Sequence, residues 1–210
     1  LAAFQQLCGI NALMSYSNSL FRQAGIEPSK LTVASTVMAA TNVGVSAVIS
    51  RVVDHWGRRR LLLTGSLLQA CSMAAITYMD TDAPGSFTGL VTVACFTTFV
   101  ASFSAGLGAV TWLYLSEIYP MEIRGAALSA CGVINWLSCF LVVFVARFLS
   151  LHHCCKLLAV LSSIGFLCVY LWVVETKGCS MDDSPLTPRS CLSARTSSTM
   201  LTTPREDPKE

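Results

Sequence analysis

The sequence predicts an all-α membrane protein with six transmembrane helices. Of its 210 residues, 53% are hydrophobic and only 12% are charged, whereas a soluble domain carries about a quarter charged residues. The charged residues also leave six long blocks free of Asp, Glu, Lys and Arg, and a helix needs about 20 apolar residues to cross a bilayer. Composition and charge placement therefore agree on a chain that crosses a membrane several times.

The predicted spans follow the charge-free blocks in order, and they cover residues 1–21, 31–50, 61–79, 88–116, 126–146 and 157–174. The fourth block already begins at Ala83, which makes it too long for one span. Its first residues include Pro84, Gly85 and Ser86, which favour a turn, so we expect the fourth helix to start near Thr88.

The beginning of the chain does not match a secretory signal. It lacks a basic leading region and a small-residue cleavage site, and its first residue is Leu rather than Met. We therefore expect the chain to be a fragment whose upstream part is missing.

The basic residues predict how the helices are oriented. If the chain enters from the cytoplasm, the cytoplasmic loops carry Arg51, Arg58, Arg59, Arg60 and Arg124. The opposite loops then carry Arg22, Lys30, Arg147 and Lys156, which agrees with the positive-inside rule. Both ends of the chain are predicted to be cytoplasmic, in the plasma membrane or an endomembrane. Residues 175–210 are rich in Ser, Thr and Pro without apolar periodicity, which predicts a disordered cytoplasmic tail.

Several function classes lack the residues that they need. The net charge is only +2 and no basic stripe with interleaved aromatics occurs, which argues against a nucleic-acid partner. No nucleophile elbow, P-loop or pair of helix histidines occurs, so we expect neither an enzyme nor a bound cofactor. The run from His152 to Cys155 holds two His and two Cys. Because the side chains of consecutive residues point in different directions, we expect a solvent-exposed loop at the start of a helix there, and no metal site.

Amide side chains inside the spans predict a binding site for a neutral solute rich in hydroxyl groups. Each sugar hydroxyl both donates and accepts a hydrogen bond, and Gln and Asn offer both functions without a charge. Trp112 is the candidate apolar platform for the face of a sugar ring. The alternative for each amide is a hydrogen bond between helices. The candidate amides are Gln5, Gln6, Asn11, Asn42 and Asn135.

The first span can present its amides to one cavity only if its helix is broken. At about 100° per residue, Gln6 and Asn11 lie roughly 140° apart around an ideal helix. Gly9 lies between them, and transporters build midplane sites from discontinuous helices. We therefore expect a helix break at Gly9.

Two loops on the predicted cytoplasmic face carry charges that can pair. The loop VVDHWGRRR follows the second span, and LSEIYPMEIRG follows the fourth. We expect these loops to place Asp54, Arg58 and Arg59 near Glu117 and Arg124. Such pairs can lock one conformation and open in another. The alternative is a set of topology anchors whose surface ion pairs contribute less than about 1 kcal/mol.

The sequence also resembles a known family through six short signatures. They are QQLCGIN in the first span, D-x-x-G-R-R-R after the second, GLGAVTW leading into LSEIYPMEIRG around the fourth, NW in the fifth and ETKG after the sixth. In this order and spacing they resemble the sugar porters of the major facilitator superfamily, specifically the facilitative glucose transporters. The resemblance covers Leu1 to about Met181.

The resemblance implies that the six helices are the seventh to twelfth of a twelve-helix transporter, forming one half-bundle of that fold. It implies a hexose site made by Gln5, Gln6, Asn11, Asn42, Trp112 and Asn135. It also implies an inner gate that includes Asp54, Arg58, Glu117 and Arg124. Where the family often has prolines, this chain has Ala109 and Thr111, so a break in the fourth span would rest on Gly106 and Gly108.

Two hypotheses from different classes follow. In the first, the chain is the C-terminal half of a facilitative hexose transporter that works by alternating access together with a missing N-terminal six-helix half in the lipid bilayer. In the second, it is a truncated, non-transporting half that associates with a full-length transporter and modulates it. Transport of a related polyol or of an oxidised sugar such as dehydroascorbate is a further option.

Overall fold

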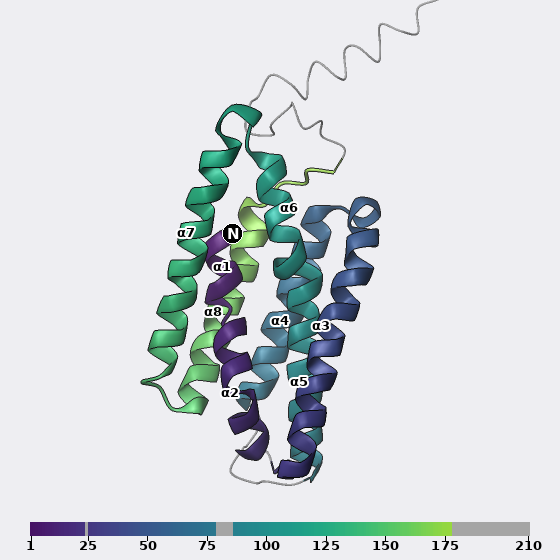
Figure 1. The fold of residues 1–210 in the computed structure, drawn as a ribbon, viewed down its shortest axis with the longest axis vertical. Helices are drawn as coiled ribbons and strands as arrows, with labels where there is room; N and C mark the ends of the chain where they lie inside the picture. The colour runs from purple at the N-terminus through teal and green to yellow at the C-terminus, as the bar shows by residue number, and fades with distance from the viewer. Residues whose placement is uncertain (24, 79–85, 178–210) are drawn as a thin grey trace, which may run out of the picture.

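The computed structural model describes residues 1–23, 25–78 and 86–177, and these residues form helices joined by short connections. Figure 1 shows the helices packed side by side in one elongated bundle. The elements are α1 (Ala2–Leu7), α2 (Ile10–Gln23), α3 (Pro28–Trp56), α4 (Arg58–Tyr78), α5 (Ser86–Phe103), the π-helix η1 (Ser104–Gly108), α6 (Ala109–Ile118), α7 (Met121–Ala146) and α8 (Leu151–Trp172). The predicted all-helical class is confirmed.

Five helices in the described part of the chain are long and apolar enough to cross a membrane. They are α3, α4, the continuous segment from Phe87 to Ile118, α7 and the segment from His152 to Trp172. The first predicted span, residues 1–21, is instead two shorter helices, α1 and α2. The expected turn at Pro84 and Gly85 and the predicted tail beyond Lys177 lie outside the described residues.

The connection between α3 and α4 is a single residue. Gly57 has a φ of +87°, a left-handed conformation that glycine adopts readily and that strains other residues. Its amide closes the end of α3 by donating to the carbonyl of Val53 at 3.1 Å, and α4 begins at the next residue. The chain therefore reverses direction tightly and brings the start of α4 beside the end of α3.

Helix α4 lies at the centre of the packing. Its most extensive contacts are with α8 and α5, and it buries Leu62 and Met73 completely. In the most apolar windows of the long helices, 44% of the residues of α4 are buried, against 6% for α3 and 11% for α7. Figure 1 shows α3 and α7 at opposite edges of the bundle. The bundle therefore has a packed centre and two exposed edges.

Two glycines let α4 and η1 approach each other at the level of the backbone. A Cβ added to Gly65 would lie 2.8 Å from the Cα of Gly106 and 2.8 Å from the carbonyl oxygen of Ser102. A Cβ added to Gly106 would in turn lie 3.1 Å from the Cα of Gly65. This close approach leaves no room for a side chain on either residue.

We expect Gly65→Ala to destabilise the bundle by about 1–3 kcal/mol, because the added methyl group meets backbone atoms that cannot rotate away. Denaturant unfolding of the chain in detergent micelles measures this loss. Gly44→Ala is the matched control, since a Cβ at Gly44 meets nothing within 4 Å. Equal stability of the two variants would contradict the close approach of Gly65 and Gly106.

Candidate functional site

The site begins at the interruption between α1 and α2. Gly9 has a φ of +84°, and a Cβ at this position would overlap the side chain of Leu158 in α8. The amide of Gly9 still donates to the carbonyl of Gln6 at 2.9 Å, and the amide of Cys8 donates to the carbonyl of Phe4 at 3.2 Å. Glycine thus changes the direction of the chain here while the neighbouring backbone groups stay hydrogen bonded.

Four amide side chains form a continuous chain of hydrogen bonds across this interruption. Asn11 in α2 donates to Gln6 in α1 at 2.7 Å. Gln6 donates to Oδ1 of Asn135 in α7 at 3.1 Å. Asn135 donates to Oε1 of Gln5 at 2.7 Å and to the carbonyl of Ala2 at 2.9 Å. All donations run in one direction, so each bond can polarise and strengthen the next.

The amide chain runs from the surface of the bundle into its interior. Asn11 is exposed and Gln6 is half-buried, whereas Gln5 and Asn135 are only 5% and 2% exposed. The amide nitrogen of Asn11 also donates to Sγ of Cys139 at 3.2 Å. Its Oδ1 accepts no hydrogen bond from the described part of the chain, so it can accept one from a solute.

The inner end of the amide chain contacts η1. Nε2 of Gln5 donates to the carbonyls of Leu107 at 2.9 Å and Gly108 at 3.2 Å. At the other end of η1, the hydroxyl of Ser104 donates to Oδ1 of Asn42 in α3 at 2.7 Å. The π-helix is therefore held by a side chain from α1 and a side chain from α3.

The structure brings most of the predicted binding residues to one region. Gln5, Gln6, Asn11 and Asn135 are linked by the hydrogen bonds above. Asn42 joins the region through η1, which contains both Gly106 and Gly108. Trp112 lies in the first turn of α6, directly after η1, and is 37% exposed. Ser104 was not among the predicted binding residues, although its hydroxyl links η1 to Asn42.

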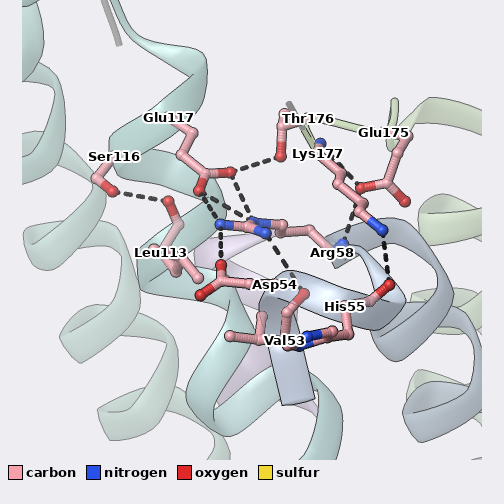
Figure 2. Close-up of polar contacts among 10 residues, drawn as sticks. All are labelled: Val53, Asp54, His55, Arg58, Leu113, Ser116, Glu117, Glu175, Thr176 and Lys177. Atoms are coloured by element: carbon pink, nitrogen blue, oxygen red, sulfur yellow. Dashed lines mark hydrogen bonds and ion pairs between the residues drawn. The ribbon is translucent and has the colours of Figure 1, made fainter. Parts of the chain in front are cut away.

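A second polar cluster lies where the α3–α4 and α6–α7 connections meet (Figure 2). Nε of Arg58 donates to both carboxylate oxygens of Glu117, at 3.0 and 3.1 Å, and Nη2 donates to Oε1 at 2.7 Å. The side chains of Arg58 and Glu117 are only 11% and 14% exposed. Asp54, whose side chain is 71% exposed, pairs with the same guanidinium at 2.9 Å. Shielding from solvent makes the pair of Arg58 with Glu117 the stronger one.

The segment after α8 completes this cluster. The carboxylate of Glu175 accepts hydrogen bonds from the backbone amides of Arg58 at 2.8 Å and Arg59 at 3.2 Å. It thereby caps the first turn of α4, where unpaired amides and the helix dipole favour a negative charge. A side chain at Gly57 would overlap this carboxylate, because an added Cβ would lie 2.7 Å from Oε2 of Glu175.

The two residues that follow Glu175 also contact the cluster. Thr176 donates to Oε2 of Glu117 at 2.6 Å, and Nζ of Lys177 donates to the carbonyl of His55 at 2.6 Å (Figure 2). The sequence prediction placed these residues in the tail that starts at residue 175, whereas the structure packs residues 175–177 against the bundle. The only sequence signal for this was the ETKG signature.

The remaining predicted charges have other contacts. Nη2 of Arg59 donates to the carbonyl of Tyr170 in α8 at 3.0 Å. Arg124 donates from Nε to the carbonyl of Tyr119 at 3.1 Å, and from Nη1 to the sulfur of Met121 at 2.8 Å. Asp54, Arg58 and Glu117 therefore form the ion-paired centre. Arg59 and Arg124 lie around it and bond to backbone carbonyls.

The His152–Cys155 run is the start of α8 rather than a loop. Cys154 and Cys155 are buried, and Nδ1 of His153 lies 2.6 Å from the hydroxyl of Ser150. Among the described residues, no group of three or more His, Cys, Asp or Glu side chains is arranged to hold a metal ion.

We expect Glu175→Gln to lower the unfolding free energy by about 1 kcal/mol, because the cap of α4 loses its negative charge. Hydrogen exchange at the amides of Arg58 and Arg59 should accelerate in the same variant, and mass spectrometry measures both. Glu27→Gln is the control, since Glu27 precedes α3 without a side-chain cap hydrogen bond and, among the described residues, its carboxylate pairs only with the exposed Lys30. Unchanged protection at the start of α4 would contradict the cap.

Proteins that are similar to this chain in sequence and in fold include sugar transporters. Residues 1–185 match the family model for sugar (and other) transporters. The chain is 31% identical to hexose transporter 1 of Toxoplasma gondii, over 88% of this chain and 33% of the relative. It is 32% identical to solute carrier family 2, facilitated glucose transporter member 8, of Mus musculus, over 87% of this chain and 43% of the relative.

A solved structure agrees with these relatives. The inward open conformation of the xylose transporter XylE from E. coli superimposes with a TM-score of 0.73 at 26% identity, over 86% of this chain and 38% of that chain. The chain therefore spans less than half the length of the relatives it matches. By sequence and by fold, this chain is a multi-pass membrane protein that belongs to the sugar transporter family of the major facilitator superfamily.

Proposed function

We propose that the chain supplies the C-terminal half of a facilitative hexose transporter that works by alternating access. The observation that carries this proposal is the amide chain that begins at the exposed Asn11 and ends in the core at Gln5. The relatives include proteins named as hexose and facilitated glucose transporters. No Asp or Glu lies in the six predicted spans, which supports uniport without an ion coupled through this half.

The chemistry of the site suits a neutral sugar. Gln6 and Asn11 offer both donors and acceptors at the accessible end of the amide chain, as a sugar hydroxyl requires. Trp112 supplies an aromatic face beside η1. In this proposal Asn135, Asn42 and Gln5 complete the hexose site. The free energy of each sugar hydrogen bond is modest, because the same groups otherwise bind water or one another.

The missing N-terminal six-helix half is the proposed partner, and α3 and α7 are its proposed docking edges. These helices are the least buried of the long helices. They carry Gly44, Gly125 and Gly132, where an added Cβ would meet nothing within 4 Å. Small residues on open helix faces let other helices approach closely in a bilayer. The site would then lie between two half-bundles that rock against each other.

The cluster around Arg58 and Glu117 is proposed as the inner gate, on the cytoplasmic side with both ends of the chain. It joins the α3–α4 turn, the end of α6 and residues 175–177. Ion pairs that bridge separate elements can hold one conformation and open in the next. In this proposal Asp54, Arg59 and Arg124 lie at the edge of the gate and change how readily it opens.

Transport of labelled D-glucose into proteoliposomes tests the proposal. We expect no saturable uptake by the 210-residue chain alone and saturable uptake when the chain is joined to an N-terminal six-helix half. L-glucose serves as the control for leakage. Uptake by the short chain alone would contradict the half-transporter. If the joined chain is also inactive but lowers uptake by a co-expressed full-length relative, the chain would be a modulating half instead.

In the joined transporter, we expect Asn11→Ala to raise the KM for D-glucose about tenfold, which corresponds to about 1.4 kcal/mol of lost binding. The variant removes the accessible end of the amide chain and leaves its buried members paired. Asn18→Ala is the matched control on the same helix, because Asn18 accepts a hydrogen bond only from Ser35 at 3.2 Å among the contacts that the structure describes. A tenfold effect of both variants would indicate a general disturbance of α2.

A further inference from the structure

Helices α7 and α8 follow each other in the chain but make almost no direct contact. They are joined by residues 147–150, at the end of the bundle away from the α3–α4 turn (Figure 1). The most extensive contacts of α7 are with α1, and those of α8 are with α4. Helix α1 ends at Leu7, and the chain changes direction at Gly9. A crevice lies between α7 and α8 at this level.

The crevice is apolar and elongated. Its volume is about 170 Å³, and it is lined by hydrocarbon side chains and the thiol of Cys154. On α8 its wall runs from Cys154 to Leu161, which corresponds to roughly 10 Å along the helix axis. An apolar cavity of about 150 Å³ stays dry and binds a hydrocarbon such as benzene. The crevice therefore suits a hydrocarbon chain that lies parallel to the helices.

The crevice opens to the outer surface of the bundle. Leu141 and Leu157 in its walls are 54% and 38% exposed, whereas Ala146 and Leu158 are only 4% and 1% exposed. Both helices contain segments long and apolar enough to cross a membrane. The open side therefore faces the acyl chains of the bilayer, which lie along the same direction as the crevice.

The proposed N-terminal half would leave this opening uncovered. Its proposed contact on α7 is the face that carries Gly132, and Leu141 follows nine residues later in the same helix. Nine residues turn an α-helix by about 180° beyond two full turns. The mouth of the crevice is thus on the opposite side of α7 from the proposed contact.

The charge at the α7–α8 connection complements a phosphate. Arg147 follows the last residue of α7, Lys156 lies in the second turn of α8, and both are exposed. The sequence has no Asp or Glu between Glu122 and Glu175. The ion pairs in the described part of the chain use neither of the two cations. Basic side chains near a membrane surface attract anionic lipid headgroups.

We propose that the crevice between α7 and α8 binds one acyl chain of a phospholipid whose phosphate lies at the α7–α8 connection, near Arg147 and Lys156. The bound chain contacts Leu158, the side chain that also packs against Gly9. The lipid thereby supports the packing beside the interruption between α1 and α2. This inference does not depend on which solute the amides bind.

Photo-crosslinking locates the acyl chain. The probe is phosphatidylglycerol with a diazirine in one acyl chain, added to the 210-residue chain in nanodiscs of unlabelled phosphatidylcholine, and mass spectrometry identifies the labelled residues. We expect labels on Val142 and Leu158, which line the crevice and are 8% and 1% exposed. Lipid that only surrounds the bundle would label exposed residues such as Ile164 and leave these two unlabelled.

Two valines of α7 give a matched pair of variants. Val145 is half-buried and lines the crevice, whereas Val133 is 60% exposed and does not. We expect Val145→Phe to fill the crevice and to lower the labelling of Val142 and Leu158 about tenfold. Val133→Phe should leave this labelling unchanged. Retained labelling of Ile164 shows that each variant is inserted in the bilayer.

Native mass spectrometry with titrated phosphatidylglycerol tests the position of the phosphate. We expect Arg147→Gln to raise the Kd of the most tightly bound lipid about fivefold, because the headgroup loses one nearby cation. Arg60→Gln, the same substitution in the first turn of α4, should leave this Kd unchanged.

Four results would overturn the inference. Labels confined to exposed residues would mean that lipid only surrounds the bundle. Equal labelling in Val145→Phe and Val133→Phe would mean that the labels do not arise from the crevice. A photoreactive sterol that labels Val142 and Leu158 where phosphatidylglycerol does not would replace the phospholipid as occupant. An unchanged Kd in Arg147→Gln would exclude the phosphate from the α7–α8 connection.

Discussion

The left-handed conformation of Gly9 is the constraint on which the candidate site depends. On a straight helix, Gln6 and Asn11 would lie roughly 140° apart, too far around the axis for their side chains to meet. The change of direction at Gly9 lets them hydrogen bond at 2.7 Å. The same change leaves Gln5 and Gln6 directed at α7 and η1. The conformation of this one glycine thus allows side chains of α1 and α2 to bond to each other, to α7 and to η1.

The bundle illustrates how a membrane chain can hold polar groups in its interior. An unpaired amide in the hydrocarbon layer is costly, and the four amides avoid this cost by bonding to one another and to backbone carbonyls. At their accessible end, Oδ1 of Asn11 accepts no hydrogen bond from the residues that the structure describes. The amides of such a site keep their hydrogen bonds when no solute is present. They can exchange one of these bonds for a bond to a solute hydroxyl, which suits reversible binding of a solute that must be released again.

Local patterns predicted the parts of the fold that depend on local chemistry. Charge-free blocks indicated the long helices, because desolvating a charge dominates the free energy of insertion, and amides in apolar runs indicated a polar site. The patterns did not show that SAGLG at residues 104–108 forms a π-helix, a segment whose side-chain partners Gln5 and Asn42 lie far away in sequence. Nor could they place Glu175 at the start of α4, 117 residues away in sequence, since long-range pairs leave no periodic trace.

The contact between Gly65 and Gly106 has a consequence for the rate of any motion at η1. Side chains that interdigitate must change rotamer before two helices can slide, and this repacking opposes small displacements. Where these glycines meet, backbone faces backbone, and neither residue has rotamers to rearrange. At this point η1 can therefore shift along α4 without a change of side-chain rotamer, so the hydrogen bonds of η1 with Gln5 and Asn42 are what opposes a small displacement here.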